Sequence, residues 1–153
     1  MGIFANTSFV AGFLAWSLAQ FLKVPMYAVI TKKWDWSRIK SSGGMPSSHS
    51  STCTAIATAI GMTSGFDNPL FTVAAGLAAI VMYDAAGVRW ETGKQAKYIN
   101  EIVETMQKPD SLTDEKLKEW IGHTPFEVAA GGVLGIIVAV AVVLTMRSHG
   151  AIK

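Results

Sequence analysis

Long stretches without any charged side chain restrict this chain to one class of fold. Lys, Arg, Asp and Glu are absent from residues 1–22, 41–66, 68–83 and 128–146. A helix needs roughly 20 apolar residues to cross a bilayer, and a chain of 153 residues fits one domain. We therefore predict an all-α polytopic membrane helix bundle in a single domain over 1–153, with about four transmembrane helices near 4–22, 49–66, 69–88 and 127–146.

The second predicted span is the least apolar of the four. Six hydroxyl-bearing residues interrupt it, namely Ser51, Thr52, Thr54, Thr58, Thr63 and Ser64. It is either a core helix of a soluble protein or a span shielded inside the bundle, where its hydroxyls bond to neighbouring helices. Glycines four residues apart, Gly61 with Gly65 and Gly131 with Gly135, let helix backbones approach closely and favour the bundle.

The segment from about 91 to 124, between the third and fourth spans, is predicted to be partly helical. Apolar residues from Ala96 to Met106 recur at helical spacing, with charged side chains on the opposite face. Such a helix lies in the membrane interface, caps the site, or packs on the bundle as a solvated helix. Residues 109–111 interrupt the pattern, and a further short helix is expected over 113–122.

Basic residues are distributed unevenly between the two sides of the predicted membrane. One side carries Lys23, Lys32, Lys33, Arg38, Lys40, Arg89, Lys94, Lys97, Lys108, Lys116 and Lys118. The other side carries only Arg147 and Lys153. Because basic loops stay in the cytoplasm, we predict an integral protein of the cell membrane with both termini outside. The same count of crossings places His49, Arg89 and His123 together on the cytoplasmic face.

The first of two histidine motifs, Pro46-Ser47-Ser48-His49, begins the second apolar run. Ser47 or Ser48 can cap a helix here, and the N–H groups of its first turn have no partners within the helix. These N–H groups and the positive end of the helix favour a phosphate. Capping alone is the alternative interpretation.

The second motif begins the last apolar run and pairs His123 with Glu127. Residues four apart share a helix face, so the carboxylate could orient the imidazole and stabilise its cationic form. The residues from Thr124 to Glu127 also form a capping-box pattern, with Pro125 at the first helical position. Both interpretations remain open on residue chemistry alone.

Three further ionisable residues lie in or at the ends of predicted spans. Asp84 lies inside the third span, where an ionisable group is costly and is usually functional or paired. Arg89 is either its ion-pair partner or a phosphate ligand, since a guanidinium matches phosphate geometry. Lys23, at the end of the first span, either extends to the membrane surface or contacts phosphate.

Together these residues carry a family resemblance. Pro46-Ser47-Ser48-His49 resembles the Pro-Ser-Gly-His motif of the type-2 phosphatidic acid phosphatase and vanadium haloperoxidase superfamily, and residues 122–128 resemble the stretch around its second histidine. Over nearly its whole length the chain is similar to a divergent bacterial and plant branch, described as acid phosphatase/vanadium-dependent haloperoxidase related. Three segments carry that similarity, namely residues 43–50, residues 84–89 and Gly93-Lys94-Gln95-Ala96.

The resemblance implies an integral membrane phosphatase that hydrolyses a lipid phosphate or polyprenyl diphosphate without a metal or other cofactor. His123 would be the nucleophile and form a phosphohistidine, Glu127 would orient it, and His49 would protonate the leaving group. The remaining candidate residues would bind the phosphoryl group, namely Arg89, Lys23, Ser47, Ser48 and Asp84. Membrane lipid is the expected partner, and nucleic acid is not.

The chain departs from the superfamily pattern in several places. The first motif, Lys followed after six residues by Arg-Pro, is absent, Ser48 replaces glycine, and Glu127 replaces aspartate. The usual six helices exceed the four predicted here, so a homodimer could complete the fold. Two other functions stay open: a non-catalytic protein that binds lipid phosphate, and a metal-dependent hydrolase with His49, His123, Glu127 and Asp84 as ligands.

Overall fold

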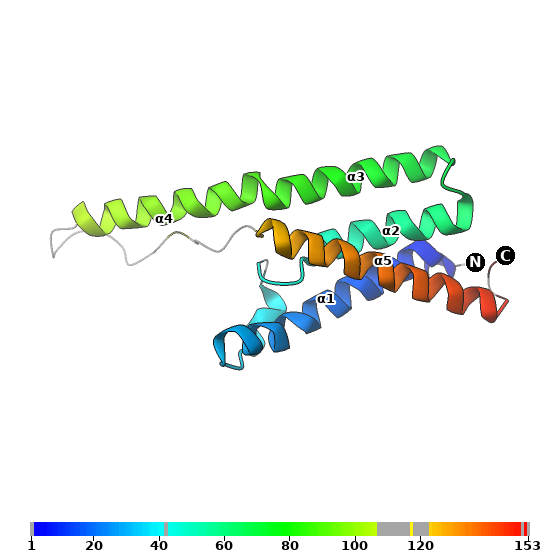
Figure 1. The fold of residues 1–153 in the computed structure, drawn as a ribbon, viewed down its shortest axis with the longest axis horizontal. Helices are drawn as coiled ribbons and strands as arrows, with labels where there is room; N and C mark the ends of the chain where they lie inside the picture. The colour runs from blue at the N-terminus through cyan, green and yellow to red at the C-terminus, as the bar shows by residue number, and fades with distance from the viewer. Residues whose placement is uncertain (1, 42, 107–116, 118–122, 151, 153) are drawn as a thin grey trace.

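The computed structural model describes residues 2–41, 43–106, 117, 123–150 and 152, and every regular element within them is helical. The elements are η1 (Ile3–Ala5), α1 (Thr7–Thr31), η2 (Trp36–Lys40), α2 (Ser48–Ser64), α3 (Pro69–Ala86), α4 (Val88–Met106) and α5 (Pro125–Ser148). The long uncharged stretches fall mainly in α1, α2, α3 and α5 (Figure 1). The predicted all-α membrane bundle is confirmed.

Side chains suited to capping set the starts of the four long apolar helices. Asn6, Ser47, Asn68 and Thr124 each accept a hydrogen bond from a backbone N–H group in the first turn of the helix that follows. Such bonds satisfy donors that have no partner inside the helix. α2 ends at Ser64, and its C-cap is Gly65, whose φ of 100° is a conformation that residues with a Cβ rarely adopt.

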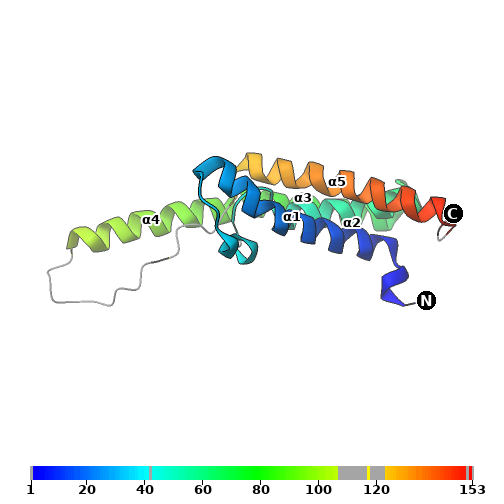
Figure 2. The same ribbon diagram turned by 90° about the horizontal axis from the view of Figure 1, so that it is seen from below.

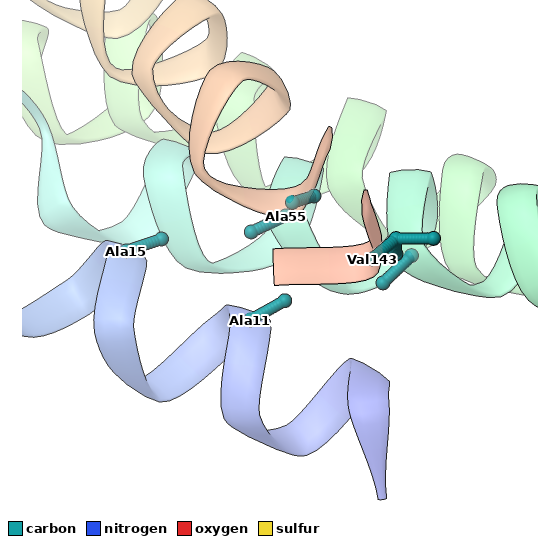
Figure 3. Packing of buried hydrophobic residues seen from close by; sticks show 6 residues of the cluster. Ala11, Ala15, Ala55 and Val143 are labelled. Carbon is teal, nitrogen blue, oxygen red and sulfur yellow. The ribbon is translucent and has the colours of Figure 1, made fainter. Parts of the chain in front are cut away.

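The core lies where α1, α2 and α5 pack against one another. Its fully buried residues are small, namely Ala11, Ala15, Ala55, Ala59, Ala139 and Val143. Figure 3 shows four labelled members of this cluster, contributed by three helices that lie far apart in the sequence. Small side chains let the helix axes approach closely, which is the usual way in which membrane helices pack.

The predicted glycine pairs behave differently from each other. A Cβ on Gly131 would collide with the carbonyl oxygen of Ser47, and one on Gly135 would collide with the Ser51 carbonyl and the Thr54 hydroxyl. This pair therefore forms the close contact between α5 and α2 that its spacing predicts. The pair in α2 is different, because Gly61 faces the ring of Phe66, which follows the end of its own helix.

Within the described residues, three helical segments are long and apolar enough to cross a membrane: Thr7–Thr31, Pro69–Glu104 and Pro125–Ser148. α2 is not one of these segments, since it has 17 residues and is only weakly apolar. It nevertheless packs against α1, α3 and α5. Its hydroxyls bond to neighbouring helices, since Ser51 Oγ donates to Ala15 O at 3.1 Å and Thr54 Oγ1 donates to Gly132 O at 3.1 Å. This is the arrangement expected of a shielded span.

Two helices extend beyond the predicted spans. α1 continues through Lys23 and Pro25 to Thr31, although the prediction ended at residue 22. α4 continues α3 nearly in line and projects past the start of α5, so it does not fold across the bundle (Figure 2). Leu117 is tied to α4 by two hydrogen bonds, because its N–H and carbonyl both bond to the Asn100 amide at 3.0 and 2.9 Å. The predicted break at 109–111 and most of the predicted 113–122 helix lie outside the described residues.

The two ends of the bundle differ in what they contain. Both chain termini lie at one end, beside the end of α2 and the start of α3 (Figure 1). At the other end, α2 and α5 begin, α3 ends, and α1 runs past them. The two histidine motifs therefore share an end of the molecule, as the crossing count predicts, and the basic segments 32–40 and 89–97 follow helices that end there.

Candidate functional site

Two histidines from distant parts of the sequence meet at the end of the bundle opposite the termini. His49 lies in the first turn of α2, and His123 directly precedes Thr124, the N-cap of α5. Their ring centroids are 6.4 Å apart, with an angle of 65° between the ring planes. The His49 side chain is exposed, whereas His123 is only 2% exposed. The site thus presents one imidazole to the outside and holds the other inside the protein.

Contacts from two helices hold His123 in place. Its backbone N–H donates to the carbonyl of Ala85 in the last turn of α3, at 3.2 Å. Its ring Nδ1 lies 3.4 Å from Oε2 of Glu127, which is an ion-pair distance but too long for a strong charge-assisted hydrogen bond. Within the described part of the chain, neither ring nitrogen has a hydrogen-bond partner. A buried imidazole in this state is costly and suggests a ligand.

Glu127 serves the helix and faces the histidine with the same carboxylate oxygen. Its Oε2 accepts the Thr124 N–H at 2.9 Å, and its own N–H donates to the Thr124 hydroxyl at 3.3 Å. These two bonds complete a capping box. Since Oε2 also faces His123, the geometry accommodates both interpretations of Glu127 that the sequence left open.

Ser47 links the beginnings of α2 and α5. Its backbone N–H donates to the carbonyl of Glu127 at 3.1 Å, and its hydroxyl accepts the Ser50 N–H at 3.4 Å. Ser50, which the sequence analysis did not single out, also donates its hydroxyl to Ser47 Oγ at 3.0 Å, and both side chains are fully buried. Ser48 follows as the first residue of α2 and is 3% exposed. Capping is therefore a definite role of Ser47.

Lys23 is buried beside the histidine end of the bundle. Its side chain is 2% exposed, and its Nζ donates to the carbonyl of Ser41 at 2.8 Å. The alternative that Lys23 extends to the membrane surface is therefore wrong. An ammonium has three N–H donors, and the described residues supply an acceptor for one of them. The Glu127 carboxylate lines the same cavity and supplies one negative charge near this cation, and the spare N–H groups can bind a further acceptor.

Asp84 and Arg89 lie at the junction of α3 and α4. Asp84 is half-buried in the last turn of α3, directly before Ala85, whose carbonyl binds the His123 N–H. Arg89 lies in the first turn of α4, but its side chain lies outside the described structure, so its phosphate role stays a prediction. Among the described residues, no three His, Cys, Asp or Glu side chains form a group that could hold a metal ion. The four-ligand set that the metal-dependent alternative requires is not assembled there.

A cavity of about 740 Å³ adjoins these residues, and Lys23 and Glu127 both line it. It lies between the last two turns of α1, the η2 segment and residues 43–45. Sequence reasoning did not find it, because no spacing rule predicts that η2 packs beside the extended end of α1. The positive helix ends of α2 and α5 and the Lys23 ammonium together favour an anion at this end of the bundle.

Comparison with known proteins agrees with the motifs. Residues 4–138 match the Divergent PAP2 family, and the matched range includes every candidate site residue. The chain is also similar to YuiD, an uncharacterized membrane protein of Bacillus subtilis strain 168, with 40% identity over 90% of this chain and 94% of that protein. No solved structure matches. The chain is therefore an integral membrane protein that belongs to the divergent PAP2 family.

Proposed function

We propose that this protein is a membrane phosphatase that hydrolyses an amphiphilic phosphate ester or diphosphate through a phosphohistidine on His123. One observation carries the proposal: the exposed ring of His49 lies 6.4 Å from the buried ring of His123, with Glu127 beside Nδ1 of the latter. A nucleophile, an acid and an orienting carboxylate are the parts that such a reaction needs.

The chemistry follows from the positions of the two imidazoles. Glu127 beside Nδ1 favours the tautomer with the proton on that nitrogen, which leaves the Nε2 lone pair for attack. The bond from Nε2 to phosphorus forms, the ester P–O bond breaks, and protonated His49 gives its proton to the leaving oxygen. Water then attacks the phosphohistidine with neutral His49 as the base, which releases inorganic phosphate and restores both rings.

Binding of the phosphoryl oxygens is assigned to groups that carry or concentrate positive charge. The N-terminal ends of α2 and α5 supply it next to His49 and His123, and the Lys23 ammonium supplies it from the cavity that it lines together with Glu127. Arg89 is proposed to add a guanidinium from the first turn of α4. We also place this site on the cytoplasmic side, because the segments that flank it carry most of the basic residues.

Phosphate release by the purified protein in detergent tests the proposal. The substrates are a long-chain phosphatidate and a polyprenyl diphosphate, assayed with EDTA and with vanadate. We expect His123→Ala to lower kcat by about 10³-fold or more, whereas His149→Ala, a substitution at the opposite end of the bundle, leaves kcat unchanged. Acid-labile phosphate on His123 after a rapid quench would identify the intermediate.

Three results would contradict parts of this proposal. Full activity of His123→Ala would exclude His123 as the nucleophile. Loss of wild-type activity with EDTA would favour metal-dependent hydrolysis. Release from neither substrate, combined with retained binding of phosphatidate, would favour the non-catalytic lipid-phosphate-binding function.

A further inference from the structure

The cavity beside α1 is too large and too apolar to serve a phosphoryl group alone. Its volume of about 740 Å³ lies within the roughly 300–1,000 Å³ range of sites that enclose a drug-sized ligand. Most of its lining surface is apolar, and its lining residues include the large side chains of Met26, Tyr27, Ile30 and Met45. A larger ligand with a substantial apolar part fits these walls.

The periodicity of α1 places the polar and apolar parts of this wall on one helix face. Four residues of α1 lie three, four or seven positions apart and therefore share one side of the helix. They are Lys23, Met26, Tyr27 and Ile30. Lys23 belongs to the candidate site, and Ile30 lies two turns further on, next to Thr31 at the end of α1. This end of α1 extends past the beginning of α5 (Figure 2). The face therefore leads from the phosphate site into the cavity.

The opposite wall is held in place by ionic and aromatic contacts. The Arg38 guanidinium lies 4.1 Å from the centroid of the Tyr27 ring, and its Nε lies 3.2 Å from the Asp35 carboxylate. The stacking fixes η2 against α1. Because Asp35 already balances the charge of Arg38, the wall at this point does not call for a second anion.

We propose that this cavity binds the apolar portion of the phosphate ester whose phosphoryl group lies at the two histidines. The inference rests on the proposed function for the position of that group, and it adds where the rest of the substrate lies. Lys23 and Glu127 line the cavity and also belong to the site, so a single amphiphilic molecule can reach both. Met26, Tyr27 and Ile30 are then specificity-determining residues, and a small water-soluble phosphate ester leaves the cavity empty.

Two neighbouring residues on α1 provide a matched test. Ile30 and Val29 are 70% and 75% exposed, but only Ile30 lines the cavity. With long-chain phosphatidate in mixed micelles, we expect Ile30→Trp to lower kcat/KM by about tenfold or more, mainly through KM, and Val29→Trp to change it by less than about twofold. With p-nitrophenyl phosphate, neither variant should change kcat/KM by more than that. Equal losses on both substrates, or no loss on the phosphatidate, would overturn the proposal.

A binding measurement separates this inference from the proposed catalysis. A phosphatidate that carries a diazirine in its acyl chain is photolysed with wild type, with His123→Ala and with a second cavity variant, Met26→Trp. We expect label on residues 23–31 and 37–45 in the first two proteins and a large reduction in the third. Labelling of these two segments without any turnover would support binding in the cavity and refute the catalytic proposal. Turnover with labelling confined to other segments refutes the inference alone.

Discussion

Replacing Glu127 with glutamine separates the two roles that its carboxylate combines. Glutamine keeps a carbonyl oxygen that can accept the Thr124 N–H, so the capping box survives the Glu127→Gln substitution. The negative charge beside Nδ1 of His123 is lost. The variant should therefore fold normally and react slowly, because the histidine ring becomes cationic when phosphorus bonds to Nε2.

The size of the effect follows from the distance between the two groups. Two unit charges 3.4 Å apart interact by about 5 kcal/mol at an effective dielectric constant of about 20. The Glu127 side chain is 22% exposed, so solvent screens the pair and the full value is an upper bound. We therefore expect kcat to fall by about 10²–10³-fold, while the free energy of unfolding changes by less than about 0.5 kcal/mol.

The assay compares kcat for phosphate release with the thermal unfolding temperature in the same detergent. Thr124→Ala is the matched control, because it removes the hydroxyl that accepts the Glu127 N–H and leaves the carboxylate in place. This variant should lose about 1 kcal/mol of stability and keep kcat within a few-fold of wild type. Wild-type kcat in Glu127→Gln, or a loss of activity that follows a loss of stability, would refute the orienting role.

Three other predictions test the packing, the buried cation and a surface carboxylate. Gly131→Ala should destabilise the protein by about 1–3 kcal/mol, because its Cβ meets the Ser47 carbonyl; Gly76→Ala, with open space at its Cβ, should be neutral or stabilising in the same thermal melts. Lys23→Gln should lower kcat/KM for phosphatidate by about 10–100-fold, and the unfolding temperature should fall by only a few degrees, because the glutamine amide can still donate to the Ser41 carbonyl. Hydrogen bonds from Ser37, and then Arg38, lower the pKa of the Asp35 carboxyl below its usual value. These hydrogen bonds stabilise η2 above about pH 4, and this stabilisation is lost as the pH falls through the lowered pKa of Asp35. An NMR titration of the Asp35 carboxyl carbon would measure that pKa.

Much of the helical architecture could be predicted from the sequence, because the bilayer requires uncharged spans to satisfy their own backbone hydrogen bonds. Uncharged stretches must be helical in a bilayer, and the helix starts at Ser47 and Thr124 follow from their capping side chains. The shared end of His49, Arg89 and His123 follows from the parity of the crossings alone. These features depend on local sequence or on the number of crossings, and they do not depend on which helices pack together.

The parts that the sequence did not reveal depend on tertiary contacts. Lys23 looked like the end of a span, yet α1 continues through Pro25 to Thr31 and the Lys23 ammonium is buried against the Ser41 carbonyl. The cavity depends on η2 returning to α1 and on the stacking of Arg38 on Tyr27. Similarly, the buried hydroxyl pair of Ser47 and Ser50 becomes significant only once α2 lies against α5.

The seam between α2 and α5 has a consequence for how this protein responds to its membrane. Because Gly131 and Gly135 lie against the backbone carbonyls of Ser47 and Ser51, the two helices are packed too closely for one to shift along the other without repacking. A thicker or thinner bilayer is then accommodated by tilting these helices as one rigid body. We expect the 6.4 Å separation of the two ring centroids to change little with bilayer thickness, because His49 begins α2 and His123 directly precedes α5.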